Sequence, residues 1–136
     1  WEGGNMRNAI PRECEVVITV PASEVEDVLA FVGECEQVWR DEFATIEDNI
    51  SFTAERVDLP KMMVPEEIRD NLVDAIYACP NGVERFIPTI PDTVETSSNL
   101  AIVEIGNGKA AIKVLTRSSR ESIRLSRAVS LWQVCT

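Results

Sequence analysis

Residues 100–116 read LAIVEIGNGKAAIKVLT, and this stretch decides the fold. Two apolar runs, residues 100–105 and 110–116, flank the tripeptide Gly106-Asn107-Gly108. An Asn-Gly pair between two such runs is a strong short-range signal for a tight β-hairpin. The sequence therefore predicts two antiparallel strands joined by a short turn.

Further elements are predicted on both sides of this hairpin. After it, Ser118 and Glu121 form a capping box, which opens a helix that runs to the end of the chain. Before it, residues 83–87 form a short strand. A preceding helix begins at Pro65, which suits a first helical turn, and stops at Pro80-Asn81-Gly82.

The first half of the chain also alternates strand and helix. Residues 14–20 and 50–55 alternate apolar with polar side chains, a pattern typical of strands. Between them, a capping box of Ser23 and Glu26 opens a long amphipathic helix. The order β-α-β-α-β-β-β-α predicts an α+β fold, with a mostly antiparallel sheet and helices on one face in a two-layer sandwich.

Composition narrows the class of protein. The chain has 136 residues, of which 45% are hydrophobic and 26% charged, as expected for one globular domain. Its formal net charge of −10 disfavours binding to the phosphate backbone of nucleic acids. No apolar run approaches the roughly 20 residues of a membrane-spanning helix.

The sequence contains no histidine, which excludes Ser-His and Cys-His catalysis and histidine-based zinc sites within this chain. Four widely spaced cysteines among apolar neighbours are expected to be reduced core thiols, which together with the lack of a signal sequence favours the cytoplasm. They are Cys14, Cys35, Cys79 and Cys135. The chain starts at Trp1 and stops inside a helical pattern, so we expect a piece of a longer protein.

Two segments carry candidate binding residues. Arg117 lies at the end of a predicted strand, just before a helix N-terminus, and a fixed guanidinium beside free helix N–H groups suits a carboxylate. Asn8 lies in a polar run that leads into the first predicted strand. The residues alone leave alternatives open, because Arg117 could simply pair with a surface carboxylate and Asn8 could serve a turn.

Four motifs in order resemble the aminoacyl-histidine dipeptidases, the Xaa-His or carnosine-cleaving family of di-zinc exopeptidases. The first, GGNMRNAIPRE at residues 3–13, resembles the family signature Gly-Gly-x-x-x-Asn-Ala-Ile-Pro-Arg-Glu. The others are PNGVER at residues 80–85, VETSSNL at residues 94–100 and RSS at residues 117–119. Together the motifs extend over most of the chain.

The resemblance implies a lid rather than a catalytic domain. In this family a separate domain holds two zinc ions, and an α+β lid closes over the substrate and in many relatives mediates dimerisation. The whole chain, residues 1–136, would then be a single lid/dimerisation domain without its catalytic zinc domain and without the lid's first strand–helix unit. We would expect a dipeptide substrate, a homodimer, and neither nucleic-acid nor membrane partners.

The resemblance also assigns roles to individual residues. It places substrate binding on Arg117, which would hold the dipeptide carboxylate, and on Asn8, which would bind a backbone or oxyanion group. Asn99 is a weaker substrate-binding candidate, with hydrogen bonding inside the sheet as its alternative. The sequence departs from the family in lacking a Gly-Gly-His-Ser-Gly segment and in having Asp92-Thr93 where Gly-Leu is expected.

Two other functional classes remain open. A stand-alone regulatory module could bind a small anion at Arg117 without any partner domain. Alternatively, the chain could be a purely structural dimerisation domain that pairs through an exposed strand edge. No catalytic residue and no metal ligand is expected within this chain under any of these interpretations.

Overall fold

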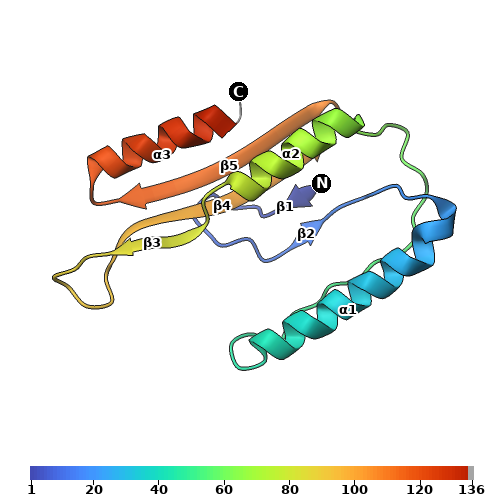
Figure 1. The fold of residues 1–136 in the computed structure, drawn as a ribbon, viewed down its shortest axis with the longest axis horizontal. Helices are drawn as coiled ribbons and strands as arrows, with labels where there is room; N and C mark the ends of the chain where they lie inside the picture. Colours follow the sequence, from blue (N-terminus) through green and yellow to red (C-terminus); the bar gives the residue numbers. More distant parts are fainter. Residues whose placement is uncertain (135–136) are drawn as a thin grey trace. The chain divides into compact units, whose positions relative to one another are not determined.

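The computed structural model describes residues 1–134. The chain divides into two compact units, of which the first joins Trp1–Val17 to the chain from Met63 onward, and the second is Ile18–Met62. The first unit contains the β-sheet and two helices, and the second contains one long helix (Figure 1).

The sheet is organised around one long central strand, β4 (Val94–Gly106). Strand β5 (Lys109–Ser118) pairs with β4 along one edge. The other edge of β4 is shared by β3 (Gly82–Phe86) near its start and by β1 (Glu2–Gly3) near its end. Strand β2 (Cys14–Glu15) pairs outside β1, and every pairing is antiparallel.

The predicted hairpin is confirmed, and its turn explains its sequence. The turn residues Asn107 and Gly108 have φ angles of 52° and 72°. Two consecutive positive φ angles define the type I′ turn, whose twist matches that of antiparallel strands. Strand β4 begins six residues earlier than the apolar run at Leu100, because the polar segment before it pairs with both β3 and β5.

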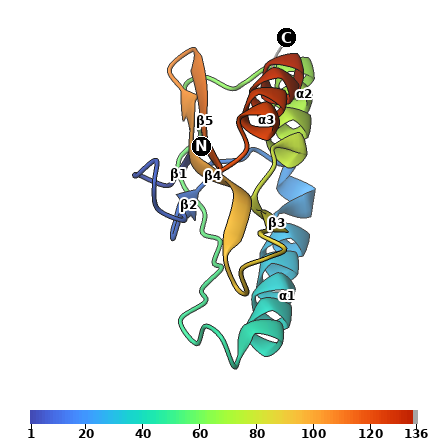
Figure 2. The same ribbon diagram turned by 90° about the vertical axis from the view of Figure 1, so that its left-hand side faces the viewer.

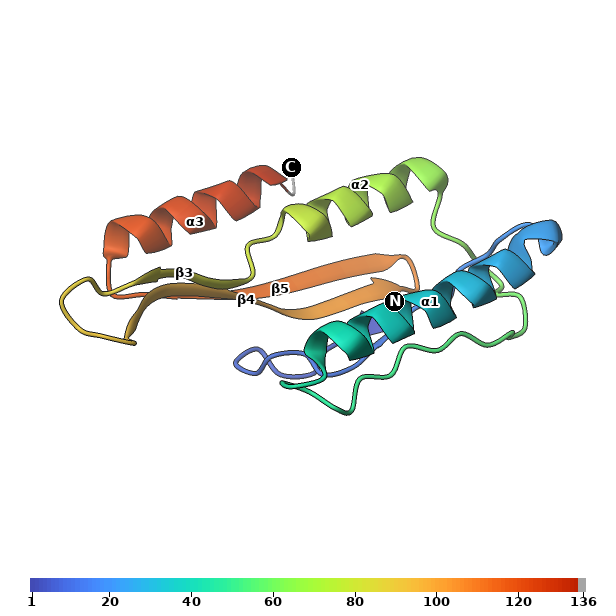
Figure 3. The same cartoon turned by 60° about the horizontal axis from the view of Figure 1, so that its bottom comes forward.

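Helices α2 (Glu66–Ala78) and α3 (Glu121–Val134) lie on the same face of the sheet (Figures 2 and 3). We call this the helix face, and the opposite side the open face. The segment that contains β1 and β2 lies on the open side of β4 (Figure 2). Buried apolar side chains gather on β4, at Ala101, Ile102 and Val103, and at Cys79 after α2. The predicted α+β fold with an antiparallel sheet is therefore confirmed.

The second unit begins with a 3₁₀ turn (η1, Ala22–Glu24) and continues into helix α1 (Val25–Phe43). The apolar stripe predicted for this helix is half-buried over its first half. Near the end of α1, the rings of Trp39 and Phe52 lie 4.8 Å apart, centroid to centroid. The chain after α1 folds back in irregular conformation, and the Phe52 N–H donates to Glu36 Oε1 over 3.1 Å.

Several sequence predictions about strands and helix caps are wrong. The strand predicted over residues 14–20 is only two residues long, and residues 50–55 form no strand, because alternation alone does not supply a pairing partner. The Ser23 capping box does not form, since the residues around it adopt the 3₁₀ turn and α1 has no side-chain cap. The Ser118 side chain accepts from the Arg120 N–H at 3.0 Å, rather than from that of Glu121.

The cysteines differ from the predicted core thiols. Cys79 is buried, Cys35 is half-buried and Cys14 is exposed; none of the three forms a disulfide. Cys135 lies outside the described residues. Within residues 1–134, no helix is both long and apolar enough to cross a bilayer.

Candidate functional site

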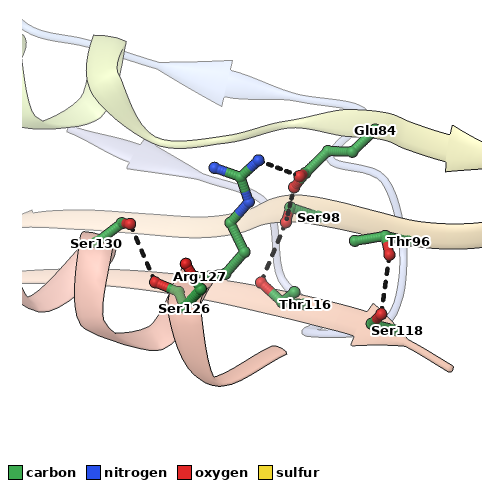
Figure 4. A network of polar contacts seen from close by, with 8 residues as sticks. All are labelled: Glu84, Thr96, Ser98, Thr116, Ser118, Ser126, Arg127 and Ser130. Carbon is green, nitrogen blue, oxygen red and sulfur yellow. Dashed lines mark hydrogen bonds and ion pairs between the residues drawn. The ribbon is translucent and has the colours of Figure 1, made fainter. Parts of the chain in front are cut away.

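Arg117 projects from β5 onto the open face of the sheet. Its strand neighbours Thr116 and Ser118 point the other way, where their hydroxyl groups meet Ser98 at 3.1 Å and Thr96 at 2.8 Å (Figure 4). Because side chains alternate along a strand, Arg117 lies on the side away from α2 and α3. Its side chain is exposed, and no carboxylate of residues 1–134 lies within ion-pair distance of it.

Asn99 lies on the same open face, one step along the neighbouring strand. Ser97 is directly opposite Arg117 in the β4–β5 ladder, and Asn99 is directly opposite Leu115. Diagonal neighbours of this kind are about 7–8 Å apart, Cα to Cα. The Asn99 amide is half-buried and donates from Nδ2 to the carbonyl oxygen of Ala9 over 2.7 Å.

Asn8 belongs to the tight turn that Asn99 contacts. The turn is closed by a 3.4 Å hydrogen bond from the Ala9 N–H to the Met6 carbonyl, with Asn8 as its third residue. Asn8 is exposed to solvent. Asn99 Nδ2 also lies 3.5 Å from the Arg7 carbonyl oxygen. The structure thus brings the segments of all three predicted site residues to one face of the sheet.

The loop that carries Asn8 runs from Gly4 to Glu13, between β1 and β2. Its base is closed by a 3.1 Å hydrogen bond from the Gly4 N–H to the Glu13 carbonyl. Gly4 has a φ of 68°, a conformation that L side chains rarely adopt. Its backbone lies against an irregularity in the β4–β5 pairing at Ala101. The loop is therefore fixed to the sheet at its base by Gly4 and at its turn by Asn99.

An ion-pair cluster around one buried carboxylate lies next to the end of β5, and it was not predicted from the sequence. The carboxylate of Glu95 has only 2% of its side-chain surface exposed, and it lies 3.3 Å from Arg85 Nε and 3.6 Å from Arg120 Nε. The Glu95 carbonyl also accepts from the Ser119 N–H over 3.1 Å. These contacts fix the segment that follows Arg117. Glu95 and Arg85 lie in the motifs VETSSNL and PNGVER, but the sequence does not indicate that their side chains pair, because only the folded sheet brings them together.

The helix face of the same strands is also polar, but its groups are paired with one another (Figure 4). Glu84 on β3 forms an ion pair with Arg127 of α3 and accepts from the Ser98 hydroxyl at 3.1 Å. Ser98 continues the chain of contacts to Thr116 on β5. This network connects β3, β4 and β5 to α3, so we interpret it as structural.

The described residues do not provide a zinc site. No group of three or more His, Cys, Asp or Glu side chains in residues 1–134 is arranged to hold a metal ion. The residues therefore do not fit the di-zinc centre of the resembled family, and the open-face site described above contains only hydrogen-bonding and cationic groups. Such a site can bind and orient a carboxylate or a peptide group.

The chain is similar to known proteins both in sequence and in fold. No family model matches the chain. The chain is 32% identical over 122 residues to the cytosol non-specific dipeptidase of Escherichia coli strain K12. That match covers 90% of this chain and 25% of the E. coli protein.

The fold comparison gives the same answer. The crystal structure of aminoacylhistidine dipeptidase from Vibrio alginolyticus superposes with a TM-score of 0.92 at 29% sequence identity. It covers 98% of this chain and 27% of the Vibrio chain. The chain therefore spans about a quarter of each relative. By sequence and by fold, it matches one domain-sized part of the aminoacylhistidine and cytosol non-specific dipeptidases.

Proposed function

We propose that this chain is the lid domain of a metal-dependent dipeptidase that hydrolyses Xaa-His dipeptides, closing over the substrate and anchoring its carboxylate. The observation that carries the proposal is the exposed Arg117, which has no ion-pair partner among residues 1–134 and shares the open face with the Asn8 turn. A guanidinium kept free of internal carboxylates is available to a carboxylate from outside.

In this proposal, Arg117 binds the substrate carboxylate through a charge-assisted hydrogen bond, and Asn8 binds a peptide or oxyanion group. Both residues would contribute by orienting the dipeptide and by excluding water when the lid closes. The two zinc ions would be held by a catalytic domain outside residues 1–134, since the described residues provide no ligand set for them. The parent protein would be cytoplasmic and homodimeric.

The proposal is tested by dipeptide hydrolysis with the zinc-loaded full-length parent, using β-alanyl-histidine and a small panel of other dipeptides. Arg117→Ala should lower kcat/KM by roughly 10- to 150-fold, the equivalent of losing about 1.5–3 kcal/mol. Lys113→Ala is a matched control, because Lys113 lies on the same strand and the same face but is paired with Glu104 at 3.2 Å. Equal activity of Arg117→Ala and the control would contradict the anchoring role.

A purely structural dimerisation domain is the second candidate. It is favoured by the outer edge of β5, which has no strand partner among residues 1–134. An unpaired edge of this length can add a strand from another chain. Sedimentation of the parent would report the association. A parent that dimerises and hydrolyses dipeptides equally well with and without Arg117 would favour this structural role over the lid.

A further inference from the structure

Asn99 lies between the two residues proposed to bind substrate, and its contacts point to a different role from theirs. Its amide group is turned toward the backbone of the Asn8 turn, 90 residues away in sequence. We infer that Asn99 is a positioning residue, which holds Asn8 over the open face beside Arg117 and acts on the substrate only through Asn8. This inference rests on the proposed function.

The geometry of the amide supports this role. A side-chain amide has two N–H donors, and Nδ2 of Asn99 lies 2.7 Å from the Ala9 carbonyl oxygen and 3.5 Å from that of Arg7. These two carbonyl groups flank Asn8 on either side. The amide N–H groups of Asn99 are therefore directed at the two carbonyl groups on either side of Asn8, where they determine the position of Asn8.

The strand that carries Asn99 is itself fixed. Asn99 pairs with Leu115 in the β4–β5 ladder, and the following N–H, that of Leu100, donates to Asn81 Oδ1 at 3.0 Å. Arg117 is attached to the same ladder two residues farther along β5. Asn99 therefore fixes the turn relative to the sheet, and so relative to Arg117.

Neighbouring contacts do not replace this tether. The base of the loop is held by the Gly4 N–H bond to Glu13 and by Asn5 Nδ2, which donates to Glu13 Oε1 over 3.2 Å. Both contacts join the two ends of the loop to each other. Among the hydrogen bonds of residues 1–134, those from Asn99 are the ones that join the turn itself to the sheet.

Hydrogen exchange of the full-length parent tests the tether without reference to activity. Asn99→Ala should increase the exchange rate of backbone amides in residues 5–12 at least about threefold, while β4 and β5 keep their protection. Ser97→Ala truncates a side chain on the same face of β4, so it serves as the control and should leave these amides unchanged. Unaltered exchange in residues 5–12 of the Asn99→Ala protein would overturn the inference.

A double-mutant cycle on kcat/KM then separates positioning from direct contact. Asn8→Ala should lower kcat/KM by roughly 2- to 12-fold, the value of one neutral hydrogen bond. Asn99→Ala should lower kcat/KM by a similar factor in the native protein, but by less than about twofold in the protein that already carries Asn8→Ala. Equal factors in both backgrounds would mean that Asn99 contacts the substrate itself, and would overturn the inference.

The isosteric variant Asn99→Asp covers the case in which Asn99→Ala fails to fold. It keeps the shape of the side chain but sets a carboxylate against two carbonyl oxygens, so the exchange of residues 5–12 should rise at least as much as in Asn99→Ala. A parent whose activity is indifferent to both Arg117 and Asn8 would refute the proposed function. The exchange experiment would still decide whether Asn99 holds the turn.

Discussion

A β-carbon on Gly4 would stand 2.0 Å from the carbonyl oxygen of Ala101. The loop backbone thus approaches β4 more closely than any side chain would allow, at the point where the β4–β5 pairing is irregular. Gly4, the second glycine of the GGNMRNAIPRE motif, is therefore required by the close approach to Ala101 as well as by its positive φ.

Gly4→Ala should destabilise the domain by about 2–5 kcal/mol, the sum of left-handed strain and overpacking against backbone. Gly108→Ala is the matched control. It has a similar φ of 72° but no atom within 4 Å of the added β-carbon, so it should cost only about 1–2 kcal/mol. Denaturant unfolding of the parent measures both. Equal losses would show that the close contact with Ala101 is not maintained.

Arg117 should discriminate substrates by their carboxylate. A dipeptide amide lacks the charge that Arg117 is proposed to bind, so native protein should hydrolyse it less efficiently than the free acid. The penalty of Arg117→Ala, roughly 10- to 150-fold on the acid, should shrink to less than about twofold on the amide. Arg117→Lys should recover only part of the loss, because lysine lacks the bidentate fork. The same penalty on acid and amide would rule out carboxylate binding.

Stability should depend on whether the arginines around Glu95 are removed alone or together with the Glu95 charge. Removing both arginines, Arg85→Ala with Arg120→Ala, leaves a buried carboxylate without a cationic partner and should lower the unfolding free energy by about 1–3 kcal/mol. Adding Glu95→Gln to that double variant should recover at least about half of the loss, since no buried charge remains. Denaturant unfolding compares the double and triple variants. No recovery in the triple variant would mean that packing, not charge, dominates the cluster.

The chain of residues 1–136 expressed by itself should hydrolyse no dipeptide and bind no stoichiometric zinc. It contains no histidine, and residues 1–134 form no cluster of three acidic or cysteine ligands. Equilibrium dialysis followed by metal analysis measures the zinc content, with the zinc-loaded parent as the positive control. One tightly held zinc ion per isolated chain would contradict the proposal that the metal centre lies elsewhere.

The sequence predicted correctly those parts of the fold that depend on the conformational preferences of neighbouring residues. The β4–β5 hairpin follows from Asn107 and Gly108, and helix α2 begins at Glu66, one residue after the predicted start at Pro65. The failures lie where structure depends on distant partners. Residues 50–55 alternate like a strand, but a strand also needs a hydrogen-bonding neighbour, and none is present there within the described chain.

The candidate site shows the same division. Arg117 could be singled out from its place between a strand and a helix, and Asn8 from its motif. The contact between Asn99 and Ala9 could not be predicted, because it joins residues 90 positions apart and depends on the register of three strands. The burial of Glu95 could not be predicted either, because a glutamate side chain is usually exposed.

The separation between Asn99 and Ala9 also has a consequence for the order of folding. The β4–β5 hairpin closes over a two-residue turn, so its loop-closure entropy is small and it can form early. The β1–β2 loop must instead find β4 across most of the chain. We therefore expect the hairpin that carries Arg117 to form first and the turn that carries Asn8 to dock last. The proposed binding surface would then be complete only at the final step of folding.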